Sequence, residues 1–263
     1  MVLWTSGALG VLGAAALHQM VATACRSVRG EGGCDTGLDR LLGFSHAASF
    51  ERARQIGTTA GSDDDRIIAG VLVDVLITVL KSRDTAAYLH SLETAAWCAR
   101  LCRLLNLDSE PSTFVIRVAL LHDIGYIRML KQALPASDAL SNQEWAIIHK
   151  HPVLGAEVLA KQTALAPYAA AVRAHHERWD GRGYPDRLKG QQIPFAARVV
   201  AVADAFHAMI SNRPYRKAAP PRAATETLLN GRSIVWDPAI VDAFIRLFFA
   251  ERTCIPTKAV SGI

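Results

Sequence analysis

The sequence is poor in cysteine and contains no CxxC pair. Its five cysteines are Cys25, Cys34, Cys98, Cys102 and Cys254. An odd number without paired spacing argues against a disulfide framework and against a cysteine-based metal site, so we expect free thiols in a reducing, cytoplasmic setting. Cys98 and Cys102 are four residues apart on a predicted helix, so they share one face and are expected to pack in the core.

The sequence also lacks a strong excess of charge of one sign. Its 29 Lys and Arg residues stand against 24 Asp and Glu residues, a net charge of +5, and no basic run of the nucleic-acid-binding kind occurs. Duplex nucleic acid is therefore not an expected partner. The mild positive balance is compatible with a small anionic substrate.

Charged side chains are missing from residues 2–25, a length that suffices to cross a bilayer. No Lys or Arg precedes this stretch, so it lacks the basic region that opens a signal peptide. Polar residues such as Thr5, His18 and Gln19 dilute its apolar character. We expect a soluble or peripheral helical segment and no membrane partner, and an N-terminal membrane anchor stays the alternative.

No stretch of strand length alternates between apolar and polar residues. Apolar residues recur instead at helical spacing from Ile67 to Leu80. Further amphipathic runs cover 94–107, 114–121, 142–160, 167–176, 196–210, 223–229 and 238–249. The pattern predicts an all-α helical bundle over 62–250 with a loop-rich insert at 177–194. A variable N-terminal segment, 1–61, precedes the domain and a tail, 251–263, follows it.

Histidine and aspartate are the chemically informative residues. The His122–Asp123 pair follows an apolar run at 118–121, so it is expected at the end of a buried helix, and the His175–His176 pair ends another helical stretch. A helical bundle can direct such side chains into one interior cavity. The candidate set is His90, His122, Asp123, His151, His175, His176 and Asp204.

These residue types are ordinary ligands for ions such as Zn, Mn and Fe. One aspartate can bridge two ions, and two ions about 3.5–4 Å apart can hold a hydroxide and stabilise both the attacking and the leaving oxygen of a phosphoester. For an isolated histidine, the competing interpretation is a buried, hydrogen-bonded core residue. We keep that interpretation for His18, His46, His149 and His207.

The insert reads HHERWDGRGYPDRLKGQQIP over residues 175–194. Its glycines and prolines mark tight turns. Trp179 and Tyr184 can either pack the loop or stack on a base. Arg213 and Arg216 follow at a helix-to-loop junction, where they can clamp phosphates or form salt bridges on a solvated face.

Taken together, these segments resemble the HD-GYP domain from about residue 67 to residue 249. A lone HD pair is a weak signal, but the ordered combination is specific. The matching segments are LHDIG (121–125), HPVLGAEVL (151–159), HHERWDGRGYP (175–185), IPFAARVVAVADAF (193–206), RPYR (213–216) and WDPAIVDAF (236–244). The resemblance implies a bacterial, all-α HD phosphohydrolase that hydrolyses cyclic di-GMP to pGpG, in some members on to GMP.

The resemblance also implies residue roles and partners. It makes the seven candidates named above metal ligands for two divalent ions, Fe, Mn or similar, with Asp123 bridging and the His122–Asp123 pair at the centre of catalysis. Ala86 stands where some members carry a glutamate for a third metal. A GGDEF-domain protein is an implied second partner. The residues that it assigns to the substrate pocket are Tyr126, Asp180, Gly183, Ile193, Arg213 and Arg216.

One departure bears on activity, because Tyr126 stands where the family has a lysine that meets a substrate phosphate. Tyrosine is neutral at pH 7, and losing a charge-assisted bond costs roughly 1.5–3 kcal/mol, on the order of tenfold to a hundredfold in rate. This leaves a catalytically weak receptor or interaction module as the alternative. A third interpretation, an HD hydrolase of another nucleotide, is disfavoured by the DGRGYP and RPYR motifs.

Overall fold

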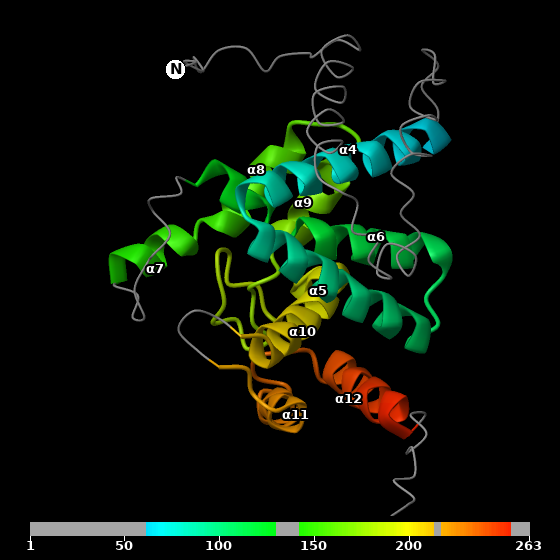
Figure 1. Cartoon of the computed structure of the whole chain (residues 1–263), viewed down its shortest axis with the longest axis vertical. Coiled ribbons are helices and arrows are strands. Elements are labelled where there is room, and N and C mark those ends of the chain that lie inside the picture. The colour runs from blue at the N-terminus through cyan, green and yellow to red at the C-terminus, as the bar shows by residue number, and fades with distance from the viewer. Residues whose placement is uncertain (1–61, 130–141, 213–216, 254–263) are drawn as a thin grey trace, which may run out of the picture. The chain divides into compact units, whose positions relative to one another are not determined.

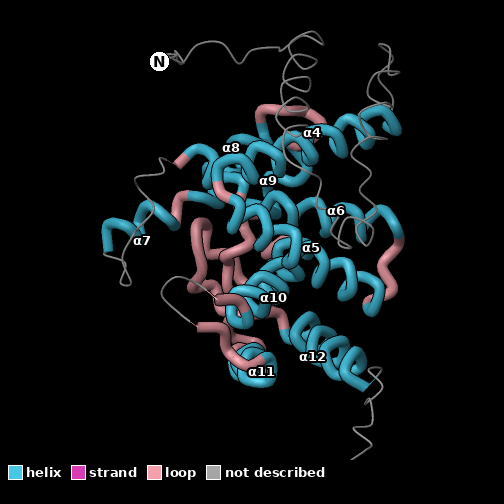
Figure 2. The backbone as a smooth tube through the Cα atoms, in the orientation of Figure 1, coloured by secondary structure: helices cyan, strands magenta, loops and turns pink. Residues whose placement is uncertain are grey.

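The computed structural model describes residues 62–129, 142–212 and 217–253. These residues form helices joined by turns, and no strand occurs among them (Figures 1 and 2). The predicted all-α class is confirmed. The segment 2–25, Arg213 and Arg216 lie outside the described residues, and no helix within the described ranges is long and apolar enough to cross a membrane.

The helices follow the predicted periodicity, but several of their ends differ from the predicted runs. Helix α5 begins nine residues before the predicted run at 94, because Asp84 caps it: the carboxylate accepts a hydrogen bond from the Ala87 backbone N–H at 2.9 Å. The predicted run 142–160 divides into two helices. The elements are α4 (Ser62–Arg83), α5 (Thr85–Leu104), α6 (Ser109–Leu121), the 3₁₀ helix η1 (Ile124–Arg128), α7 (Asn142–Ile148), α8 (His151–Ala160), α9 (Ala166–Arg173), the 3₁₀ helix η3 (Gly190–Gln192), α10 (Phe195–Ile210), α11 (Pro221–Asn230) and α12 (Pro238–Thr253).

Helix α5 lies at the centre of the core. It packs against α4, α6, α10 and α12, and Figure 1 shows it beside α10 in the middle of the bundle. Cys98 and Leu101 on α5, Val118 on α6 and Phe206 on α10 are completely buried. The cysteines of α5 are therefore core residues, as predicted, and burying apolar side chains of this kind is the main stabilisation of the fold.

The break between α7 and α8 has a local cause in Pro152. Proline has no backbone N–H, so the carbonyl of Ile148 cannot receive the hydrogen bond that a continuous helix would supply from residue 152. The His151 imidazole donates to that carbonyl instead, from Nδ1 at 2.7 Å. A proline in the sequence thereby both ends a helix and orients a candidate ligand.

The predicted insert is an ordered loop. The buried carboxylate of Glu177 accepts hydrogen bonds from the N–H groups of Asp186, at 2.6 Å, and Leu188, at 3.1 Å. A Cβ at Gly183 would lie 2.4 Å from the backbone nitrogen of Arg178, so the close return of the chain requires glycine there. Across the loop, the N–H of Trp179 donates to the carbonyl of Val235 at 2.9 Å, which ties the insert to the segment before α12.

Candidate metal centre

Three of the candidate ligands share one local arrangement. His122, His151 and His175 follow the ends of α6, α7 and α9 by one, three and two residues, and His151 is also the first residue of α8. The last carbonyls of a helix lack intrahelical partners, and each histidine donates Nδ1–H to one of them, three residues earlier in the chain. The acceptors are the carbonyl oxygens of Ala119, Ile148 and Val172, at 2.7, 2.7 and 2.6 Å.

This arrangement determines the tautomer of each ring. A carbonyl oxygen only accepts, so Nδ1 must carry the proton, and in the neutral imidazole Nε2 then presents a lone pair. A backbone or carboxylate acceptor at the opposite nitrogen is the usual support of a metal-binding histidine. The three histidines are therefore oriented as ligands through Nε2.

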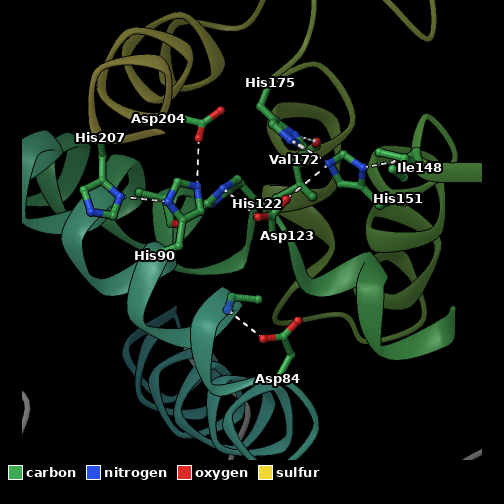
Figure 3. A network of polar contacts seen from close by, with 12 residues as sticks. Asp84, His90, His122, Asp123, Ile148, His151, Val172, His175, Asp204 and His207 are labelled. Atoms are coloured by element: carbon green, nitrogen blue, oxygen red, sulfur yellow. Dashed lines mark hydrogen bonds and ion pairs between the residues drawn. The ribbon is translucent and has the colours of Figure 1, made fainter. Parts of the chain in front are cut away.

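The candidate ligands form two groups, each with its ligand atoms within 4.8 Å of one another. One group is His90, His122 and Asp204, and the other is His151, His175 and His176. Asp123 lies between them: its Oδ2 is 3.2 Å from Nε2 of His122, and its Oδ1 is 3.3 Å from Nε2 of His151 (Figure 3). Its two oxygens thus each face one group.

The close approach of Asp123 to α8 depends on Gly125. A Cβ at this position would lie 2.0 Å from the carbonyl oxygen of His151 and 2.8 Å from the backbone nitrogen of Gly155. Any side chain would push η1 away from α8. The glycine of the HDIG motif therefore holds the His122–Asp123 pair against His151.

The electrostatics favour a cation at the centre. Burial lowers the pKa of His176 to about 4 and the pKa of His175 well below its usual value, so these rings are neutral. At His122 burial acts in the same direction, but the carboxylate of Asp123 outweighs it and raises the pKa to about 9. Burial would raise the pKa of Asp123, yet the imidazole of His122 holds it well below its usual value. The carboxylate is therefore ionised, beside a protonated His122 and the neutral rings of His175 and His176.

An unsatisfied atom tests whether the residues fit a metal ion. Nε2 of His122 is fully buried and makes no hydrogen bond, although Oδ2 of Asp123 lies 3.2 Å away. A buried polar atom without a partner is costly unless something else satisfies it. Nε2 also faces the ligand atoms of His90 and Asp204. Imidazole nitrogens and carboxylates around such an atom are the donor set of a divalent transition-metal ion.

His207 contacts a candidate ligand, a role that its sequence position did not predict. We expected a buried core histidine, but its ring is half-buried, and its Nδ1 lies 2.8 Å from Nδ1 of His90. The other nitrogen of His90, Nε2, lies 2.8 Å from Oδ1 of Asp204. The available signal was the spacing of Asp204 and His207, three residues apart on α10, which puts both on one helix face.

His149 also differs from its expected role. It is exposed, in the turn between α7 and α8, and its ring stacks on Tyr184 with the centroids 4.0 Å apart. Tyr184 in turn lies against the ring of His176, with the centroids 5.0 Å apart. The aromatic residue of the GYP motif thus packs the loop against the metal centre. The predicted core position of His149 is wrong, because the residue lies in the exposed turn between α7 and α8.

The predicted pocket residues have distinct surroundings. The ring of Tyr126 stacks on His151, with the centroids 4.6 Å apart, so it does reach the metal centre. Asp180 forms a two-bond ion pair with Arg178, at 3.1 and 2.6 Å, and hydrogen bonds within the loop. Ile193 is buried in the core. Contact of these residues with a substrate stays a prediction.

Comparison with known proteins places the chain in a family. The family model "HD domain" matches residues 74–240. The response regulator RpfG of Xanthomonas campestris pv. campestris, a cyclic di-GMP phosphodiesterase, is 37% identical over 65% of this chain and 46% of its own length. The cyclic di-GMP phosphodiesterase PA4108 of Pseudomonas aeruginosa is 33% identical over 74% of this chain and 49% of its own length. The chain thus spans about half the length of these relatives.

One further relative and one solved structure are also similar to this chain. A 3′3′-cGAMP-specific phosphodiesterase 2 of Vibrio cholerae is 32% identical over 67% of this chain and 34% of its own length. The solved structure of Bd1817, an HDG"Y"P protein of Bdellovibrio bacteriovorus, matches with a TM-score of 0.54 at 17% identity, over 89% of this chain and 78% of that one. The chain belongs to the HD domain family, and its resemblance to the HD-GYP proteins is confirmed.

Proposed function

We propose that this chain is a metal-dependent phosphodiesterase that hydrolyses cyclic di-GMP. The observation that carries the proposal is the position of Asp123, with one carboxylate oxygen toward each ligand group, 3.2 Å from His122 and 3.3 Å from His151. One carboxylate between two convergent sets of ligands is the arrangement that a pair of divalent ions requires. We take the ions to be two, of the Fe or Mn type.

Two bound ions would supply an activated water and neutralise charge on the phosphodiester. The chain's own residues supply the geometry. The backbone carbonyls that accept hydrogen bonds from Nδ1 of His122, His151 and His175 orient each Nε2 toward the centre. No ring therefore has to rotate when an ion binds. Asp123 stays ionised because the neighbouring imidazoles lower its pKa.

The loop at 177–194 covers one side of this centre. Its tyrosine, Tyr184, lies against His176, and Glu177 fixes the loop through two backbone N–H groups. A rigid loop beside the ions positions a bound substrate without further ordering cost. The pocket roles of Asp180, Gly183, Ile193, Arg213 and Arg216 belong to this proposal, as does docking of a GGDEF-domain protein.

Cyclic di-GMP is the favoured substrate because a relative named for it is 37% identical to this chain, whereas relatives named for 3′3′-cGAMP are 32% and 33% identical. The product would be pGpG, with GMP as a further step. The Vibrio relative named for 3′3′-cGAMP, at 32% identity, makes that dinucleotide the direct competitor. Both molecules present the same phosphodiester ring and differ in one base, so the same metal chemistry serves either.

The test combines metal content with turnover. Protein purified without oxygen and without chelator is analysed for metal per chain, and cyclic di-GMP and 3′3′-cGAMP are assayed in parallel. We expect about two ions per chain and faster turnover of cyclic di-GMP. Asp123→Asn should lose metal and at least about 100-fold in rate, since bound ions contribute several kcal/mol to the transition state.

Asp242→Asn is the matched control. It makes the same carboxylate-to-amide change on α12, at a residue remote in sequence from every candidate ligand. Asp242 forms an exposed ion pair with Arg232. Its metal content and rate should equal those of the unchanged chain. Absence of both metal and turnover in the unchanged chain would overturn the proposal, and faster turnover of 3′3′-cGAMP would overturn the substrate assignment alone.

A further inference from the structure

We propose that His207 is a positioning residue that orients His90 toward the metal ion of the His90–His122–Asp204 group. The inference rests on the proposed metal centre. Nδ1 of His207 lies 2.8 Å from Nδ1 of His90, and the two rings stack with centroids 5.0 Å apart at an interplanar angle of 21°. The contact joins residues 117 positions apart in the chain.

The hydrogen-bond partner of Nδ1 in His90 differs from those of the other candidate histidine ligands. His122, His151 and His175 donate to backbone carbonyls, which only accept, so their tautomers are locked. The partner of His90 is an imidazole, whose Nδ1 either donates or accepts depending on its own tautomer. Of these four ligands, His90 is therefore the one whose tautomer is adjustable.

His207 has a further hydrogen-bond partner. Its Nε2 lies 2.9 Å from the hydroxyl of Ser211, and a hydroxyl also serves as donor or acceptor. Asp204 and His207 are three residues apart on α10 and share one helix face, and Ser211 is the C-cap residue that follows the helix. A single face of α10 therefore carries both a candidate ligand and the support of another.

These contacts permit two proton arrangements. Without an ion, His90 donates from Nε2 to Asp204 at 2.8 Å, so its Nδ1 accepts from His207. Binding of an ion to Nε2 requires the lone pair there, so His90 must carry its proton on Nδ1 and donate to His207, which then donates from Nε2 to Ser211. A side chain that accepts at Nδ1 is what stabilises the metal-binding tautomer.

The inference predicts a selective defect. Loss of a supporting partner of a metal-bound histidine typically lowers metal affinity by about 10–100-fold. His207→Phe keeps an aromatic ring but removes both nitrogens. It should lower the affinity for one ion by that factor and leave the ion of the His151–His175–His176 group in place. His207→Asn retains a donor and an acceptor and should recover most of the affinity.

The experiment titrates the zinc-loaded protein with a chelator and follows metal per chain, with ¹⁵N NMR of the imidazoles as a second readout. We expect one of two ions to dissociate from His207→Phe at a chelator concentration about 10–100-fold lower than in the unchanged chain. In the unchanged chain the NMR should show His90 protonated at Nδ1 with zinc and at Nε2 without it. Ser211→Ala is the second variant and should weaken the same ion less.

Phe206→Leu is the matched control, because Phe206 is adjacent on α10 but packs in the core against Trp97 and Phe244. It should lower stability and leave both metal affinities unchanged. Unchanged affinities in His207→Phe, or an equal loss in Phe206→Leu, would overturn the inference while the metal centre stands. An unchanged chain that binds no zinc would overturn the metal centre itself.

Discussion

Nε2 of His151 and Nε2 of His175 face each other at 3.2 Å, although both nitrogens carry a lone pair. The opposite nitrogen of each ring donates to a backbone carbonyl, of Ile148 and Val172, so no proton is left for a hydrogen bond between the neutral rings. Two lone pairs at this distance repel unless a cation lies beside them. A metal ion bound by both nitrogens would relieve this repulsion.

Metal removal should accordingly destabilise the protein. A metal ion whose free concentration is 100 times its dissociation constant adds about 2.7 kcal/mol to the free energy of unfolding. For a domain of this size, each kcal/mol shifts Tm by about 2–4 °C. Manganese added to chelator-treated protein should raise Tm by roughly 5–10 °C per ion, measured by scanning calorimetry. His175→Phe should show a smaller rise, and an equal rise would contradict the assignment of His175.

Gly125→Ala should disrupt the metal centre. The added Cβ would meet the carbonyl oxygen of His151 at 2.0 Å, and backbone cannot yield as a side chain can. We expect a loss of at least about 1–3 kcal/mol in unfolding free energy, together with loss of metal. Gly70→Ala is the control: its Cβ meets only the end of the Arg117 side chain, at 3.1 Å, and alanine in a helix gains about 0.5–1 kcal/mol.

The ion pair of Arg198 and Asp237, at 2.6 Å, should stabilise the loop. It is mostly buried, with side chains 17% and 5% exposed, and Arg198 also donates to the carbonyl of Ile193 at 3.0 Å. Arg198→Gln should cost about 3–5 kcal/mol, because it leaves a buried carboxylate unpaired.

Urea unfolding measures this cost against Arg232→Gln. Arg232 pairs with Asp242 at the same 2.6 Å, but both side chains are more than 40% exposed. Exposed pairs contribute about 0–1 kcal/mol. Equal effects of the two substitutions would show that burial does not set the strength of the Arg198 pair.

Cys98 and Cys102 should resist alkylation in the native protein. Burial raises the pKa of Cys102 to about 11 and that of Cys98 well above its usual value, so at pH 8 both remain protonated thiols, which are poor nucleophiles. Peptide mapping after iodoacetamide treatment should find both unmodified at pH 8 and modified after unfolding in urea. Modification of either at the rate of an unfolded peptide would contradict their core position.

Tyr126→Lys tests the alternative of a weak receptor module. Tyr126 stacks on His151 at 4.6 Å, where a lysine would place a charge beside the centre. If the neutral tyrosine limits turnover, Tyr126→Lys should raise kcat by roughly tenfold to a hundredfold, from a charge-assisted bond of about 1.5–3 kcal/mol. Tyr126→Phe, which keeps the ring, should leave the rate low. An unchanged kcat in Tyr126→Lys would make tyrosine a tolerated variation.

Much of the fold could be predicted because helical periodicity is a local property. The run from Ile67 to Leu80 lies within α4, and the run from 238 to 249 lies within α12. The site pairs were also visible, since His122–Asp123 and His175–His176 are adjacent in the sequence. Helix ends were harder to predict: a single side-chain cap at Asp84 and a proline at 152 decided them.

Contacts between distant residues depended on the tertiary structure. The sequence by itself determined which residues could bind a metal, because the residue types and the order of the motifs are properties of the sequence. Only the packing of α5 against α10 placed His207 on His90, 117 residues away. Only the approach of η1 to α8 put Asp123 between two groups. Helical spacing states which side chains share a face, but which faces meet is decided by the burial of the whole core.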